Sequence, residues 1–241
     1  MLLVMMYHFV EEAKHSNSIL MLKDHLEYIE NRYDIVLPGD PVSLKKLSVC
    51  LTFDDGLFSF YYYIFPILKR LKIRALLSVP VKYILNTTSV SSDIRLSLPY
   101  YEAMREDVYK DKAPFCTWEE LSEMVASGYV EVASHSYSHC NLTFPGINVY
   151  KEVVLSKKIL EDHIAQNVST FVYPFGRVSP SLQKTVLDNY PYTMRIGSAL
   201  NRTWGGKMFR VVGDGLKSPC QPFSALRLLH YHMKYVVNSC R

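Results

Sequence analysis

The regular alternation of short apolar runs with amphipathic segments most constrains what this 241-residue chain can fold into. The apolar runs have strand character, and we expect strands at residues 2–7, 48–53, 75–79, 129–133, 170–173, 192–196 and 208–212. Apolar residues at helical spacing predict helices at residues 19–29, 58–71, 117–128, 149–164, 180–188 and 223–237. This alternation favours an α/β fold with a mainly parallel sheet, either open or closed into a barrel.

Composition indicates a globular chain without a nucleic-acid-binding character. Apolar residues make up 49% and charged residues 21%, and the net charge is only +4 with no Lys/Arg run longer than two residues. The longest apolar stretch, residues 1–7, is too short for a transmembrane segment. No repeat or linker-like break occurs, so we expect a single domain over residues 1–241. Residues 86–116 lack a clear period and predict a surface excursion with a short helix near 99–109.

The amino-terminal stretch MLLVMMYHFV has no basic region before it and no small-residue cleavage site, and Glu11 and Glu12 follow it. We therefore interpret it as a buried first strand rather than a signal peptide. The five cysteines form no C-x-x-C pair, which is typical of free thiols in a reducing compartment. If Met1 is the native start, these features predict a cytoplasmic protein, including one at the inner membrane surface. A chain trimmed of its signal would have the same features.

Two adjacent carboxylates, Asp54 and Asp55, follow the expected strand at 48–53 and precede Gly56. Asp-Asp-Gly is ordinary turn chemistry, so a purely structural turn is one interpretation. However, ligands of parallel α/β folds bind at the carboxyl ends of the strands. His8 and His135 also follow expected strands, so all these side chains are predicted at one edge of the sheet.

His135 and His139 lie four residues apart in the segment Ser-His-Ser-Tyr-Ser-His. If this segment is helical, both imidazoles lie on one face and can share a metal ion; the alternative is a pair of surface histidines. Two histidines with one carboxylate form a common catalytic zinc set, and Asp55 is the candidate third ligand. Asp54 would then face the water molecule that the metal activates and take its proton.

At this point the chain resembles a known family. "TFDDG" at 52–56, "HSYSH" at 135–139 and "YPFG" at 173–176 are similar to three motifs of the polysaccharide deacetylases, the NodB-homology domain of carbohydrate esterase family 4. The segment 117–139 resembles the helix and strand that lead to the family's histidines. "MMYHF" at 5–9 resembles the subgroup that deacetylates poly-N-acetylglucosamine. The likeness runs from about residue 4 to residue 212.

The resemblance implies a distorted (β/α) barrel of about seven strands and an amide hydrolase. Asp54 would be the catalytic base, and Asp55, His135 and His139 would bind a divalent metal. Zinc is the expected metal, and nickel, cobalt and manganese are also used in the family. The reaction would remove an N-acetyl group from an amino sugar, with a backbone N–H in residues 173–175 near the oxyanion.

The departing amine needs a general acid, for which the sequence offers two histidines. His230 matches the family's late Leu-x-His motif, but the surrounding residues have helical spacing. His8 follows the first expected strand, where the poly-N-acetylglucosamine subgroup has an equivalent Tyr-His pair. We therefore predict that His8 is the acid, and that His230 lies on a helix face.

The third motif departs from much of the family, because Val172 stands where an arginine usually pairs with the base aspartate. Arg177 or Arg210 would have to reach Asp54 instead. For substrate binding we expect contributions from a small set of residues near the third motif and in a glycine-rich loop: Tyr173, Pro174, Phe175, Arg210 and Trp204.

The sequence thus predicts a metal-dependent amino-sugar N-deacetylase of surface polysaccharide biosynthesis, such as that of lipopolysaccharide O-antigen. The expected substrate is an acetylated amino sugar, either lipid-linked or nucleotide-linked. Two alternatives stay open. One is a deformylase or other amidase acting on a lipid- or nucleotide-linked sugar, and the other is a catalytically silent glycan-binding homologue, which the missing third-motif arginine motivates.

Overall fold

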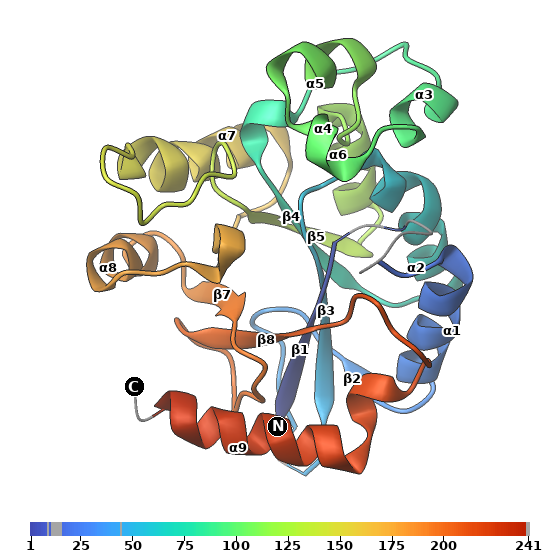
Figure 1. The fold of residues 1–241 in the computed structure, drawn as a ribbon, viewed down its shortest axis with the longest axis vertical. Coiled ribbons are helices and arrows are strands. Elements are labelled where there is room, and N and C mark those ends of the chain that lie inside the picture. The colour runs from blue at the N-terminus through green and yellow to red at the C-terminus, as the bar shows by residue number, and fades with distance from the viewer. Residues whose placement is uncertain (9, 11–15, 44, 240–241) are drawn as a thin grey trace.

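The computed structural model describes residues 1–8, 10, 16–43 and 45–239, and within them seven parallel strands close into a barrel surrounded by helices (Figure 1). The order around the barrel is β1-β8-β7-β6-β5-β4-β3, and β1 pairs with β3 to close it. The strands are β1 (Leu2–Tyr7), β3 (Ser48–Phe53), β4 (Ala75–Val79), β5 (Val130–Ser134), β6 (Thr170–Val172), β7 (Tyr192–Ile196) and β8 (Met208–Val212). A two-residue strand, β2 (Asp34–Ile35), pairs with the start of β3. The predicted distorted (β/α) barrel is therefore confirmed.

The barrel strands are near-continuous apolar runs because both of their faces are buried, the inner face by the barrel interior and the outer face by helices. Every residue of β1, β3 and β4 is buried. Alternate residues form an interior cluster that fills the barrel where the strands begin, with Leu2, Val4, Cys50, Leu76, Val172 and Met208 among its members. Toward the carboxyl ends the interior becomes polar, with Thr52, Ser78 and Arg210. The sequence therefore places polar chemistry at one end of an otherwise apolar barrel.

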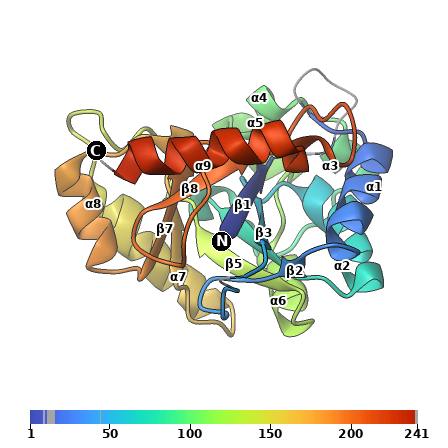
Figure 2. The same cartoon turned by 90° about the horizontal axis from the view of Figure 1, so that it is seen from below.

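The helices cover the outside of the barrel (Figures 1 and 2). They are α1 (Ile19–Glu30), α2 (Phe65–Leu71), α3 (Ser92–Leu96), α4 (Tyr100–Ala103), α5 (Glu106–Lys112), α6 (Trp118–Ala126), α7 (Ser156–His163), α8 (Pro180–Leu187) and α9 (Ala225–Ser239). The hydroxyl of Ser18 caps α1, and Thr117 and Glu120 form the capping box that begins α6. These sequence-based helix starts are confirmed.

The structure departs from the expected elements at three places. π-helical segments, Phe60–Ile64 and Tyr150–Leu155, replace the first turns of the helices expected at 58–71 and 149–164. The excursion at 86–116 contains three short helices, α3 to α5, rather than one. Buried Arg95 fixes this excursion, because its guanidinium donates to both carboxylate oxygens of Glu120 on α6, at 2.6 and 2.9 Å. Figure 1 shows α3–α5 at one end of the molecule and α9 at the other.

None of the helices in the described part of the chain combines the length and apolar character that crossing a bilayer would require. The four described cysteines are free thiols, and Cys240 lies outside the described residues.

Candidate active site

The Asp54–Asp55 pair forms a tight turn at the carboxyl end of β3. Asp55 has φ +72° and Gly56 has φ +65°, so the chain turns through two successive left-handed residues. A Cβ atom on Gly56 would lie 2.6 Å from the Val79 side chain, which excludes other residues there. The left-handed conformation of Asp55 costs about 1–2 kcal/mol. The turn interpretation is thus correct for the backbone, while the two carboxylates contact different partners.

Asp54 is buried and contacts Arg210 in a two-pronged ion pair. Nη1 and Nη2 of Arg210 donate to Oδ1 and Oδ2 of Asp54 at 2.7 and 2.8 Å, and the Ser78 hydroxyl donates to Oδ1 at 2.8 Å. Burial alone would raise the pKa of Asp54, but the charge and hydrogen bonds of Arg210 hold that pKa well below its usual range. Arg210, rather than Arg177, is therefore the arginine that pairs with Asp54.

Asp55, His135 and His139 form a cluster whose ligand atoms all lie within 4.8 Å of one another. Oδ1 of Asp55 is 3.6 Å from Nε2 of His135 and 3.3 Å from Nε2 of His139. Ligands about 2.0–2.1 Å from one tetrahedral zinc ion would have similar separations. Both Asp55 oxygens are buried without a well-formed hydrogen bond from the residues that the structure describes. Because such a carboxylate is costly to bury, the three residues suit a divalent cation.

The segment that carries the two histidines is a turn, not the helix that would have explained their spacing. Ser136 and His139 have φ of +66° and +56°, and the turn brings the two rings within 4.7 Å. Nδ1 of His135 lies 2.8 Å from the Val172 carbonyl, to which it must donate, so Nε2 is left as an acceptor. Burial lowers the pKa of His135 to about 4, which keeps the ring neutral. His135 is therefore in the form that binds metals.

Glu152 fixes this turn and was not recognised in the sequence. Its buried carboxylate accepts hydrogen bonds from the Ser138 N–H and hydroxyl, at 2.9 and 2.8 Å. The Tyr83 hydroxyl donates to the Ser138 carbonyl at 3.1 Å, and the His139 N–H donates to the Ser136 hydroxyl at 3.0 Å. Ser138 lies between the two histidines in the chain, so these bonds hold the turn that carries both rings.

His8 lies just beyond β1 and is paired with Asp214. Its Nδ1 is 2.6 Å from Oδ2 of Asp214, and its Nε2 is 3.8 Å from Oδ2 of Asp54. Burial would lower the pKa of His8, but the Asp214 hydrogen bond and the Asp54 charge raise it to about 9. The ring is therefore the charged imidazolium at neutral pH, with a proton on both nitrogens. His230, the other candidate acid, is exposed on α9.

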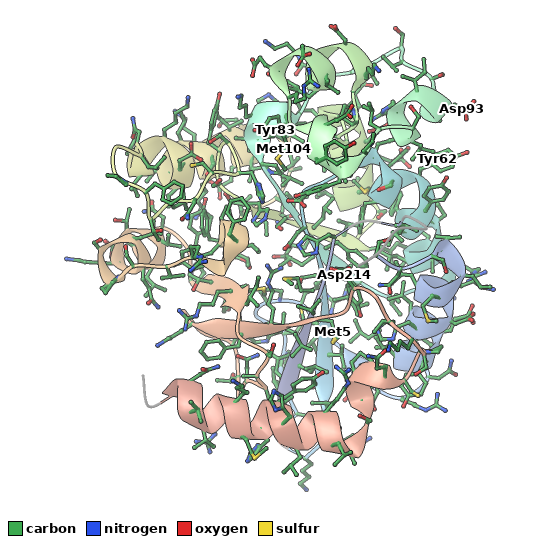
Figure 3. All side chains as sticks on the ribbon, viewed as in Figure 1. Met5, Tyr62, Tyr83, Asp93, Met104 and Asp214 are labelled. Carbon is green, nitrogen blue, oxygen red and sulfur yellow. The ribbon has the colours of Figure 1, made fainter. Side chains whose placement is uncertain are left out.

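Asp214 was also missed in the sequence, although it follows β8 as the other site carboxylates follow β3. It lies near the centre of the view in Figure 3. The Gly213 N–H donates to the Met6 carbonyl at 2.8 Å, and a Cβ atom on Gly213 would lie 2.3 Å from the Tyr7 ring. The Asn17 side-chain amide donates to the Gly213 carbonyl at 2.7 Å. Close packing against β1 therefore holds Asp214 beside His8.

These groups surround a cavity of about 180 Å³. Tyr100 of α4 also lines it, so the excursion that had no readable period contributes directly to the site. Burial and the nearby Asp55 carboxylate raise the pKa of Tyr100, so the phenol stays neutral. The lining comprises Met6, His8, Asp54, Tyr100, His135, His139, Tyr173, Phe175, Gly176, Ile196 and Arg210.

The third-motif segment forms one wall of this cavity. Phe175 has φ +56° and an exposed fraction of 57%, and its ring lies 4.9 Å from that of His139, while Pro174 is buried beside it. The Tyr173 N–H donates to the Met194 carbonyl, and the Gly176 N–H donates to the Tyr173 carbonyl. Proline has no N–H, which leaves the Phe175 N–H as the candidate oxyanion donor of this segment.

The structure does not bring Trp204 to this cavity. Its indole N–H donates to the Asp40 carbonyl at 2.7 Å, and its ring lies 6.2 Å from that of Tyr192, the first residue of β7. Because the loop at 197–207 returns to the start of β8, it places Trp204 where strands begin, at the end opposite the cavity.

Comparisons with known proteins identify the family and the fold of this chain. A sequence profile of the polysaccharide deacetylase family matches residues 42–194. A curated relative, the poly-beta-1,6-N-acetyl-D-glucosamine N-deacetylase of Escherichia coli strain K12, is 28% identical over 121 residues. The aligned region is 50% of this chain and only 16% of that relative's length.

Solved structures share the fold at low sequence identity. IcaB from Ammonifex degensii has a TM-score of 0.71 and 22% identity, over 94% of this chain and 97% of that one. The deacetylase PplD from Streptococcus pyogenes, solved in complex with acetate, has a TM-score of 0.72 and 18% identity, over 95% of this chain and 97% of that one. A polysaccharide deacetylase from Bacillus cereus has a TM-score of 0.72 and 21% identity, over 94% of this chain and 68% of that one. With the profile match covering more than half of the sequence, the chain belongs to the polysaccharide deacetylase family.

Proposed function

We propose that this chain hydrolyses the N-acetyl group of an amino sugar and releases acetate and a free amine. One observation carries the proposal: Nε2 of His8 and Oδ2 of Asp54 lie 3.8 Å apart on the cavity that His135 and His139 also line, and the raised pKa of His8 and the lowered pKa of Asp54 favour the charged form of each. An acid and a base at one site are what amide hydrolysis requires, because water must lose a proton while the leaving nitrogen gains one.

Asp55, His135 and His139 would hold the divalent ion, for which we propose zinc. The ion would supply Lewis-acid chemistry, polarising the amide carbonyl and making water acidic enough to be deprotonated near neutral pH. The neutral His135 ring and the buried Asp55 carboxylate, which lies against both histidines, support this assignment.

Asp54 would act as the base. Its Oδ2 accepts one hydrogen bond, from Arg210, and a carboxylate oxygen offers two acceptor positions, so one stays free to take a proton. As the water oxygen bonds to the acyl carbon, its proton moves to Asp54. Arg210 stabilises the ionised carboxylate before the attack and thereby keeps it in the form that can accept the proton of the water molecule.

His8 would act as the acid. When the C–N bond breaks, the nitrogen takes the Nε2 proton of His8, and Asp214 stabilises the charged ring that exists before this transfer. The Phe175 N–H would donate to the oxygen that becomes negative during attack. The two products are acetate and the sugar with a free amine.

For the substrate, we propose an N-acetylated hexosamine of a surface polysaccharide or of its lipid- or nucleotide-linked precursor, such as an O-antigen intermediate. The curated relative is named for poly-β-1,6-N-acetylglucosamine, and the acetate in the PplD structure matches the proposed product. Exposed Phe175 beside His139 offers a flat apolar surface on which a sugar ring can stack.

The test is release of acetate by zinc-loaded protein from β-1,6-linked N-acetylglucosamine oligomers, a nucleotide-linked N-acetylhexosamine and a lipid-linked one. Asp54→Asn should abolish release, whereas Asp188→Asn, a change at an exposed carboxylate on the end of α8, should leave it unchanged. Release of formate from formylated sugars instead of acetate would assign a deformylase. If the parent protein binds the sugars but releases neither acetate nor formate, the glycan-binding alternative would be assigned.

A further inference from the structure

Helix α9 has two opposite faces, and the outward face is apolar. On the inward face Tyr231 is buried, and its carbonyl accepts a hydrogen bond from the Leu200 N–H at 3.2 Å. On the outward face, apolar side chains recur every three or four residues, with exposed fractions from 49% to 81%: Leu226, Leu229, Met233, Val236 and Val237. At 3.6 residues per turn these five, the α9 stripe, cover about 100° of the helix surface, opposite Tyr231.

The α9 stripe lies away from the catalytic cavity. The Leu200 segment that contacts α9 continues to Asn201, which exchanges backbone hydrogen bonds of 2.8 Å with Leu2 at the start of β1. His8 follows the other end of that strand. Figures 1 and 2 show α9 running along the outside of the molecule, and no other element of the described part of the chain lies over its outer side. Contiguous exposed apolar residues of this kind mark a surface that binds another apolar phase.

The charged residues of the chain segment that contains the α9 stripe are of one sign. From residue 215 to residue 239 the sequence contains no Asp or Glu, whereas Lys217, Arg227 and Lys234 are cationic. In helical projection Arg227 and Lys234 fall on one flank of the stripe, together with His230, and His232 falls on the other. This pattern combines an apolar stripe with cationic flanks, as in helices that lie in a membrane interface.

A second copy of the chain is a poorer partner for the α9 stripe. Two such helices packed stripe to stripe would bring cationic flanks together, with no carboxylate of α9 to pair with Arg227 or Lys234. An anionic lipid surface accommodates both features, since head groups pair with the flanks and acyl chains receive the stripe.

We propose that α9 binds the protein to the surface of an anionic lipid membrane, lying parallel to it with the α9 stripe in the interface. This interaction does not depend on the proposed catalysis, because no residue of α9 lines the catalytic cavity.

The experiment is co-sedimentation of the whole protein with phosphatidylcholine vesicles that contain or lack phosphatidylglycerol. The stripe variant is Leu229→Gln/Met233→Gln. Its matched control is Leu20→Gln/Ile94→Gln, which removes two apolar side chains of similar exposure, 63% and 47%, from α1 and α3. The charge variant is Arg227→Gln/Lys234→Gln. All these positions are exposed, and thermal unfolding will show that each variant folds.

We expect binding to phosphatidylglycerol vesicles only, weakened by salt. The stripe variant and the charge variant should each bind on the order of tenfold more weakly, and the matched control should bind like the parent. Equal binding by the stripe variant, or equal binding to vesicles without phosphatidylglycerol, would overturn the proposal. The proposal would also be overturned if light scattering showed that the parent is a dimer and the stripe variant a monomer, and if neither protein bound vesicles. Acetate release from a soluble substrate should be the same in all four proteins, which separates this test from that of catalysis.

Discussion

Arg210 and Asp54 form a fully buried, two-pronged ion pair across the interior of the barrel, with N–O distances of 2.7 and 2.8 Å. Arg210 belongs to β8 and Asp54 follows β3, and β1 lies between these two strands. The pair therefore exists only because the barrel closes. It fixes the proposed base in its ionised form and links the last strand to the second strand of the barrel along the chain.

Replacing Arg210 with leucine should destabilise the protein by about 3–5 kcal/mol at neutral pH, because it leaves the Asp54 charge buried without a partner. Since Arg210 lowers the pKa of Asp54, its stabilisation is present above the unfolded pKa of Asp and is lost as pH falls through the folded one. Urea unfolding at several pH values measures the free energy of unfolding of the parent and of the variant. In the variant, the acidic limb of the kcat/KM profile should also move to higher pH.

Arg177→Leu is the matched control, since Arg177 follows the third motif without pairing with Asp54. Its free energy of unfolding should change by less than about 0.5 kcal/mol. A similarly small change in Arg210→Leu would contradict the importance of the buried pair.

Replacing Asp214 with asparagine should lower the pKa of His8 from about 9 by about 1–3 units, because the carboxylate no longer stabilises the imidazolium. The raised pKa means that the acid form persists below about 9 in the parent, so the alkaline limb of kcat should move to lower pH in the variant. The same pair stabilises the fold below the unfolded pKa of His, and this contribution declines as pH rises through about 9.

Two measurements test this assignment together: the pH–rate profile and the NMR titration of the His8 ring. His230→Ala should leave both the rate and the alkaline limb unchanged, because His230 is exposed on α9. A large loss of kcat in His230→Ala, with an intact limb in Asp214→Asn, would transfer the acid role to His230.

Zinc should stabilise the parent but not His139→Ala. A ligand at a hundred times its dissociation constant adds about 2.7 kcal/mol to the free energy of unfolding, which corresponds to roughly 5–10 °C in Tm for a chain of this size. Thermal unfolding with zinc and with chelator measures the shift, and elemental analysis counts bound ions. His163→Ala, at an exposed histidine that stacks on Trp118, is the control and should retain the full shift.

Glu152→Gln should weaken zinc binding by about 10- to 100-fold, the usual effect of losing a partner that orients the metal ligands. The substitution converts an acceptor of two hydrogen bonds into an amide that cannot accept both at Ser138. Competition with a chromophoric chelator gives the affinity directly. Glu119→Gln, at an exposed position in the first turn of α6, should bind zinc like the parent, and equal affinity in both variants would leave Glu152 with a structural role only.

Much of the fold was readable from local patterns. Five expected strands coincide with the observed ones: 2–7, 48–53, 75–79, 192–196 and 208–212. They could be predicted because a strand that is buried on both faces is a nearly continuous apolar run in the sequence. The excursion at 86–116 was not readable, since its short helices depend on tertiary contacts such as the Arg95–Glu120 pair. The π-helical segments also have no sequence signal that distinguishes them from ordinary helix.

For the site, the sequence by itself determined which residues are candidates, through their types and spacing: Asp54, Asp55, His135 and His139, with His8 at the end of a strand. Only the tertiary structure decided their partners. Arg210, Asp214, Glu152 and Tyr100 come from segments distant in sequence, and the loop of Trp204 leads to the opposite end of the barrel. The physical reason is that a side chain's partner is set by strand order and barrel closure, which bring together carboxyl ends that no local pattern connects.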